Sequence, residues 1–312
     1  MPVSASANRT TLGVHRQSGS DIVTLANLEQ HPANVYFVDS NATLKDDVAT
    51  AGRSADFPFA TIDFAIGQCT AGQGDVIYVM PGHTETVSGA AGIDFDVADV
   101  KVIGLGWGAN RPTITLSAVA STVHVDAASI WIENLIFTVS ADATIVIDVD
   151  KADCTIKDCE FRNSATKEAV TFIDITGAAN GCDRARVLGC VFRAPGAGTT
   201  QAIELGEVAD GVVIRDCWAF GAFGAAAIHN PTGKILTLLT IMDCVLVNTT
   251  AASHSIELVS ACTGIIAFNR LGSPLADATP TDLDGGACHM LENFSHDAGG
   301  NDQGLRNPVV DT

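Results

Sequence analysis

A short triplet of apolar, polar and apolar residues recurs seven times along the chain between Ile93 and Leu258. Successive triplets start 24 to 30 residues apart, which is too irregular for an array of helical hairpins but natural for a coil whose connections vary in length. Alternation with period 2 indicates β-strands, in which the central residue points away from its neighbours. Only Asn230 breaks the apolar third position. The triplets are Ile93-Asp94-Phe95, Val123-His124-Val125, Ile147-Asp148-Val149, Ile173-Asp174-Ile175, Ile203-Glu204-Leu205, Ile228-His229-Asn230 and Ile256-Glu257-Leu258.

A second apolar run follows each triplet with a constant internal spacing. One repeat is too short to bury both of its apolar runs, so the repeats are expected to stack as rungs about 4.8 Å apart. Stacking would create continuous inward columns of side chains, and the sequence therefore predicts an all-β fold, a right-handed parallel β-helix. One predicted column of large apolar residues contains Trp107, Phe137, Phe161, Phe192, Ala219, Leu246 and Leu271.

The segments outside the repeat have a different character. Between Asp56 and Ile66, a proline near the start and apolar residues on one side predict a short amphipathic helix. Such a helix would cover the open end of the coil, where strand edges and core are otherwise exposed. The predicted regions are an N-terminal arm (1–34), a capping region with the helix and the first strand (35–92), the β-helix rungs (93–271) and an extended C-terminal segment (272–312).

The net charge of -19 would repel nucleic-acid backbones, and the 17 basic residues are scattered along the chain. No apolar stretch approaches the length needed to span a bilayer. The segment from Met1 to Gln17 lacks the apolar core of a secretory signal. We therefore expect no nucleic-acid or membrane partner, and a chain that stays in the compartment where it is made.

The nine cysteines raise the question of disulfides or zinc. Four of them, Cys159, Cys190, Cys217 and Cys244, fall on one inward column, and the sequence contains no C-x-x-C pair. A stack of small buried hydrophobic side chains is therefore favoured over a zinc site. Without a secretory signal, reduced thiols are expected.

Three segments ahead of the rungs resemble the pectin-lyase-like β-helix superfamily. Within it, the sequence is most similar to the β-helix structural proteins of tailed bacteriophages, over about residues 35 to 271. The resemblance implies the fold but leaves the function open, because the superfamily includes lyases, hydrolases, tail spikes and structural proteins. The three segments are Val35-Tyr36-Phe37-Val38-Asp39-Ser40, Pro58-Phe59-Ala60-Thr61-Ile62 and Gly74-Asp75-Val76-Ile77-Tyr78-Val79.

The central triplet residues are predicted to form an outward column of Asp94, His124, Asp148, Asp174, Glu204, His229 and Glu257. Carboxylate pairs of this kind act as acid and base in β-helix glycosidases, and β-helix lyases bind calcium at similar positions. If the chain is an enzyme, the consecutive acids Asp148, Asp174 and Glu204 are the catalytic candidates. However, the Arg-x-Pro-x-x-Arg pattern of pectate lyases and the signatures of polygalacturonases are absent. With three tryptophans and two tyrosines, there are also few platforms for sugars. A protein without catalytic activity, cofactor or metal is favoured.

A neighbouring outward column contains the apolar residues Trp131, Val213 and Ile265. These indicate a face covered by another copy of the chain, although single apolar residues on a surface are also ordinary. The two histidines of the first column lie between acids and would partly compensate their repulsion. The predicted oligomer interface consists of Trp131, Val213, Ile265, Asp94, His124, His229 and Glu257.

Together, the residues and the resemblance favour a non-enzymatic virion structural protein, a homotrimeric capsid decoration or cement protein. Its expected partners are other copies of itself and the major capsid protein or other virion proteins, with assembly in the host cytoplasm. The alternative is a tail spike or another β-helix that binds or cleaves polysaccharide.

Overall fold

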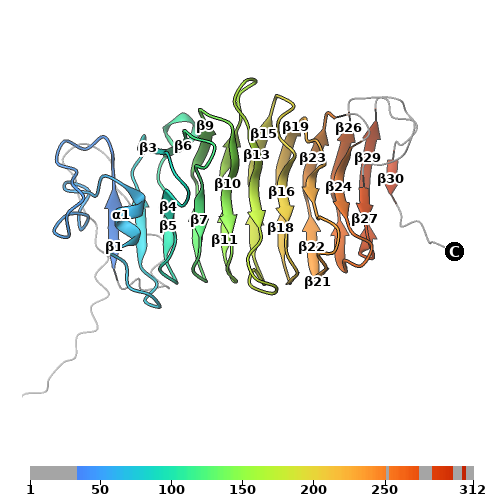
Figure 1. Cartoon of the computed structure of the whole chain (residues 1–312), viewed down its shortest axis with the longest axis horizontal. Helices are drawn as coiled ribbons and strands as arrows, with labels where there is room; N and C mark the ends of the chain where they lie inside the picture. The colour runs from blue at the N-terminus through green and yellow to red at the C-terminus, as the bar shows by residue number, and fades with distance from the viewer. Residues whose placement is uncertain (1–33, 251–252, 274–282, 298–303, 307–312) are drawn as a thin grey trace, which may run out of the picture.

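A computed structural model describes residues 34–250, 253–273, 283–297 and 304–306. The chain winds into one elongated coil in which strands from successive turns lie side by side (Figure 1). Apart from the last pair, β29 with β30, the strands pair in parallel. The all-β parallel β-helix predicted from the periodicity is therefore confirmed. The predicted N-terminal arm lies outside the described residues except for Asn34.

Each turn contributes one strand to each of three sheets, which we name A, B and C in chain order. Rungs are numbered from the sheet A strand that opens them, so that β4 opens rung 1 and β27 opens rung 8. Sheet A contains β4 (Ile93–Asp94), β7 (Val123–Val125), β10 (Ala143–Val149), β13 (Ala169–Ile175), β16 (Gln201–Leu205), β20 (Ala226–His229), β24 (His254–Leu258) and β27 (Leu283–Gly285). Sheet B contains β1 (Val35–Val38), β2 (Val76–Val79), β5 (Lys101–Gly104), β8 (Trp131–Glu133), β11 (Thr155–Lys157), β14 (Arg186–Leu188), β18 (Val213–Arg215), β22 (Leu239–Met242), β25 (Gly264–Ala267) and β28 (His289–Leu291). Sheet C contains β3 (Thr84–Val87), β6 (Thr113–Leu116), β9 (Ile136–Val139), β12 (Glu160–Arg162), β15 (Val191–Ala194), β19 (Trp218–Gly221), β23 (Val245–Asn248), β26 (Arg270–Ser273), β29 (Asn293–Asp297) and β30 (Gly304–Arg306). A small additional pair joins β17 (Ala209–Asp210) to β21 (Leu236–Thr237).

The inward columns fill the coil as the periodicity predicted. Phe161 is fully buried and stacks on Phe137 and Phe192 of the adjacent rungs, with ring centroids 5.1 and 5.0 Å apart. Phe172 from sheet A packs against the same stack. Aromatic rings from two sheets therefore fill the middle of the coil and tie its rungs together.

Trp107 does not belong to this column, contrary to the prediction. Its side chain is 87% exposed, beside the short 3-10 helix η1 (Gly108–Asn110). The connection from sheet B to sheet C is longer in rung 1 than in the later rungs. As a result, Ile114 pairs with Phe137 and takes the inward position.

The predicted cysteine column lies inside the coil. Cys159, Cys190, Cys217 and Cys244 are all buried. The column continues in two buried asparagines at the C-terminal end: Asn269 donates through Nδ2 to Asn293 Oδ1 at 2.9 Å and accepts from the Cys244 N–H at 2.9 Å. These amides meet the hydrogen-bonding needs of backbone groups that small apolar side chains would leave unpaired.

The corner between sheets B and C depends on left-handed backbone. In rungs 2 to 8 the residue directly after the sheet B strand has positive φ, and Asn, Asp and Gly tolerate this conformation best. Phe268, with φ of 59°, departs from those residue types and is 41% exposed. The column is Asn134, Asp158, Gly189, Asp216, Asp243, Phe268 and Glu292.

Replacing Phe268 by asparagine is therefore expected to stabilise the fold by about 1 kcal/mol, because asparagine adopts the left-handed region at lower cost. The measurement is chemical unfolding followed by circular dichroism. Phe268→Ala is the matched control, since it removes the same ring without favouring positive φ. Equal stability of the two variants would contradict the strain argument.

A one-turn helix, α1 (Ile62–Ile66), lies beside the N-terminal strands. The Thr61 hydroxyl accepts a hydrogen bond from the Phe64 N–H at 3.4 Å, as an N-cap residue does. The apolar side of α1 is buried against β1, β2 and β4. The amphipathic helix predicted here is thus a single turn, and its role as a cap stays a prediction.

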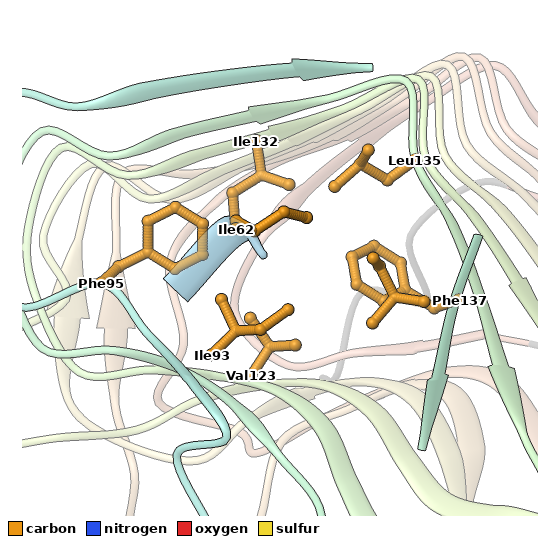
Figure 2. A pocket seen from close by; sticks show the side chains of 8 residues that line it. Ile62, Ile93, Phe95, Val123, Ile132, Leu135 and Phe137 are labelled. Carbon is orange, nitrogen blue, oxygen red and sulfur yellow. The ribbon is translucent and has the colours of Figure 1, made fainter. Parts of the chain in front are cut away.

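A small void separates α1 from the side chains of the first rungs (Figure 2). Its volume is about 10 Å³, room for about one water molecule, and every side chain around it is apolar. It is therefore a packing gap in the core and not a ligand site. The lining residues are Ile62, Ile93, Phe95, Ile114, Val123, Ile132, Leu135 and Phe137.

The strand ladder extends beyond the predicted boundary at residue 271. Residues 283–297 supply β27, β28 and β29, which add rung 8 to all three sheets. The short strand β30 then pairs antiparallel with β29. An antiparallel strand at this position covers the sheet edge that would otherwise be open to pairing with another chain.

Candidate functional site

The predicted outward column lies on sheet A in the predicted register. His124 pairs with Asp94 and Asp148, and Asp174 pairs with Asp148 and Glu204. His229 and Glu257 follow on the next two rungs. The structure also adds Asp284, the partner of Glu257 on rung 8. We call this set, Asp94, His124, Asp148, Asp174, Glu204, His229, Glu257 and Asp284, the acidic column.

His124 links two carboxylates at the N-terminal end of the acidic column, those of Asp94 and Asp150. Its Nδ1 lies 3.3 Å from Asp94 Oδ1, and its Nε2 lies 3.2 Å from Asp150 Oδ2. Partial burial disfavours the imidazolium, but the hydrogen bond to Asp150 and the nearby carboxylate charges outweigh it and raise the pKa of His124. The expected compensation of acids by interleaved histidine thus has a structural basis here. It also involves Asp150, which lies two residues after Asp148 and was not among the site residues predicted from the sequence.

The same group could hold a divalent cation. One ligand atom from each of His124, Asp148 and Asp150 lies within 4.8 Å of the others. The Thr176 hydroxyl lies 3.0 Å from Asp148 Oδ1 and 3.1 Å from Asp150 Oδ1, and it can donate its hydrogen to either. Mixed imidazole and carboxylate ligands suit several divalent ions. However, the hydroxyl and the imidazole already compensate these carboxylates, so the geometry does not require an ion.

Asp174 is the most buried acid of the column. Its side chain is only 7% exposed, and its Oδ1 has no hydrogen-bond partner among the described residues. Burial, followed by the charges of Glu204, Asp148 and Asp150, raises the pKa of Asp174 to about 8. At neutral pH this carboxyl is therefore mainly protonated and can serve as a proton donor.

On the two rungs after that of Asp174, two further buried polar atoms have no partner among the described residues, Gln201 Oε1 and His229 Nδ1. Gln201 Nε2 donates to Thr171 Oγ1 at 2.8 Å and also to Glu204. Buried polar atoms without partners usually contact ordered water or a ligand. Rungs 4 to 6 of sheet A are therefore the part of the column best suited to binding a polar molecule.

The second predicted column also follows the expected register, on the outer side of sheet B. Trp131 is engaged within the chain, since its Nε1 donates to Glu133 at 2.7 Å and Lys101 Nζ lies 4.5 Å from its ring. Val213 is partly exposed and Ile265 is 46% exposed. Thr155 and Arg186 separate Trp131 from Val213, and Thr240 separates Val213 from Ile265, so the three apolar side chains do not form a continuous apolar surface. Their role in an interface stays a prediction.

A different outer surface, on sheet C, was missed in the sequence. The rings of Trp218 and Phe220 stack with their centroids 5.8 Å apart, and the Arg193 guanidinium lies 5.0 Å from the Trp218 ring. Arg162 and Arg193 both contact Glu160, at 2.7 and 3.3 Å. Val191, Val245 and Val247 surround the rings, and Arg270 follows on rung 7. We call Arg162, Val191, Arg193, Trp218, Phe220, Val245, Val247 and Arg270 the basic-aromatic face.

No protein-family model and no curated protein matches the sequence. Among solved structures, a rhamnogalacturonan lyase is 12% identical, with 89% of this chain and 90% of that chain covered and a TM-score of 0.42. The ORF18 protein of Geobacillus virus E2 is 11% identical, with 85% and 62% covered and a TM-score of 0.36. These similarities assign neither a family nor an activity. Within the described residues, no helix is both long enough and apolar enough to cross a membrane.

Proposed function

We propose that the chain is a non-catalytic structural protein of a virion, a capsid decoration or cement protein that works as a homotrimer. The assembling role is supported by large apolar side chains exposed on rungs 5 to 8. Seven of the twelve large apolar side chains that are exposed among the described residues lie on these rungs, and contiguous exposed apolar side chains are typical of an interaction surface. The seven are Phe220, Ile235, Leu238, Ile265, Phe268, Leu291 and Phe294. The virion assignment is supported by the resemblance of the sequence to phage β-helix proteins.

Sedimentation velocity of the full chain at micromolar concentration is expected to show a trimer. The trimer is then expected to bind particles that lack the protein, as seen by negative-stain labelling with an antibody against residues 93 to 271. A monodisperse monomer that does not bind such particles would contradict the proposal.

One observation favours a second function, cleavage of an acidic polysaccharide. Asp174 holds its proton near neutral pH, as a general acid must, and Asp148 and Glu204 flank it on adjacent rungs. Strands about 4.8 Å apart bring neighbouring carboxyls close to the roughly 5 to 5.5 Å separation of retaining glycosidases. The acidic column could thus supply an acid and a nucleophile.

The test is incubation of the full chain with acidic polysaccharides, with and without calcium. For the structural role we expect neither reducing ends nor unsaturated products to be released. Turnover that disappears in Asp148→Asn, Asp174→Asn or Glu204→Gln would replace the structural function by the catalytic one. Turnover that these variants retain would indicate a contaminating enzyme.

A further inference from the structure

The two outer surfaces described above carry opposite charge. Sheet A presents the acidic column, with Asp150 beside it. Among the described residues, the strands of sheet C carry three arginines on their outer side, Arg162, Arg193 and Arg270. The same outer side carries one acid, Glu160. A chain with a net charge of -19 thus concentrates arginines and exposed aromatic rings on one side. Complementary charge on two surfaces of one molecule favours contact between copies of it.

The acids and arginines also occupy the same rungs. Rung 3 carries Asp148 on β10 and Arg162 on β12, and rung 7 carries Glu257 on β24 and Arg270 on β26. On rung 4, Arg193 occupies the height of Asp174. A rotation about an axis parallel to the coil keeps every rung at its own height. Two copies related in this way bring Arg162 and Arg270 level with Asp148 and Glu257 of the neighbour without any shift along the coil, whereas Asp174, level with Arg193, is buried and mainly protonated.

Rung 5 carries exposed aromatic rings at the centre of the basic-aromatic face. Trp218 and Phe220 project from sheet C, and Phe220 is 46% exposed. At this height Gly206 follows the sheet A strand β16, and a Cβ there would come within 2.7 Å of the Thr176 methyl and 2.9 Å of Asp174 Oδ1. The Thr176 and Asp174 side chains therefore already fill the space beside Gly206.

We infer that the acidic column of one copy binds the basic-aromatic face of the next copy, with the coils parallel and their rungs level. The inference deepens the proposed assembling function and rests on it. A contact between two different surfaces closes into a ring when its rotation is a whole fraction of a turn without a shift along the axis, and a third of a turn gives the proposed trimer. The arginines and the Trp218–Phe220 pair would lie at the centre of each interface, where such residues contribute most to binding.

Rung 7 provides the cleanest test, because both partners are accessible. The Glu257 side chain is 39% exposed with His254 Nδ1 at 3.7 Å, and Arg270 is exposed. Arg270→Glu and Glu257→Arg are each expected to raise the dissociation constant of the full-chain oligomer about tenfold or more, because like charges then face each other. The double variant restores opposite charges and is expected to recover wild-type assembly. Melting curves at a dilution where all forms are monomeric control for folding.

The other outcomes are equally informative. If wild type is a trimer that Val213→Lys dissociates while both charge reversals leave it intact, the interface lies on sheet B. This inference then fails, while the assembling function stands. If the double variant stays dissociated, the two residues do not pair and the inference also fails. If wild type is a monomer that binds polygalacturonate through Arg193, the basic-aromatic face is a glycan platform, and both the inference and the proposed assembly fail.

Discussion

Replacing Phe161 by aspartate is expected to abolish the soluble folded protein. The ring is fully buried between Phe137 and Phe192, so the carboxylate would face apolar neighbours above and below. Losing the ring and burying an unpaired charge together cost at least about 4 kcal/mol, a large part of the stability of an ordinary domain. The measurement is soluble yield, with circular dichroism and thermal unfolding of any soluble fraction.

Phe220→Asp is the matched control, because it makes the same substitution on an outward position of sheet C. Phe220 is 46% exposed, so its aspartate remains hydrated and the β-helix is expected to form. Both variants are melted at concentrations where only monomers are present, so oligomerisation does not affect the comparison. Wild-type-like melting of Phe161→Asp would show that the inward register of sheet C is wrong.

The rungs could be predicted from the sequence because their chemistry repeats. Asp148, Asp174 and Glu204 lie between apolar neighbours at matching positions, and a strand can present such a triplet in only one way if its apolar residues are buried. The outward column and its register followed from this alone. What the pattern does not contain is the degree of burial, which separates Asp174 from the other two acids.

Features that break the repeat were harder to place. Trp107 has the expected spacing, but the longer connection in rung 1 carries it out to solvent. Asp284 belongs to a strand, but the proline and glycines around it interrupt the apolar spacing, so the repeat could not be recognised there from the sequence. Trp218 and Phe220 did leave a signal: they flank Ala219, the small residue of the inward column, and alternation points both of them outward.

Asp174→Asn is expected to stabilise the protein at alkaline pH and to flatten the dependence of its stability on pH. The pKa of Asp174 is raised from about 3.8 to about 8 on folding, mainly because burial disfavours the carboxylate. Between these pH values the folded state binds more protons at this site than the unfolded state. Stability contributed by the site is therefore greatest below pH 4 and falls as the pH rises toward 8. Asparagine carries no charge at any of these pH values and avoids that loss.

Urea unfolding of wild type and Asp174→Asn at pH 4 and pH 9 measures the effect. Burial and the charge of Asp150 also raise the pKa of Asp148, so Asp148 adds to the pH dependence of stability in both proteins. The difference in stability between wild type and Asp174→Asn therefore reports on Asp174 alone. Asp216→Asn is the control, because it makes the same substitution at an exposed corner where asparagine tolerates the left-handed backbone. The gain in free energy of unfolding of Asp174→Asn over wild type should be larger at pH 9 than at pH 4. The corresponding difference between Asp216→Asn and wild type should be the same at both pH values. Parallel profiles for wild type and Asp174→Asn would mean that Asp174 is ionised in the folded protein at neutral pH, and it could not then act as a proton donor.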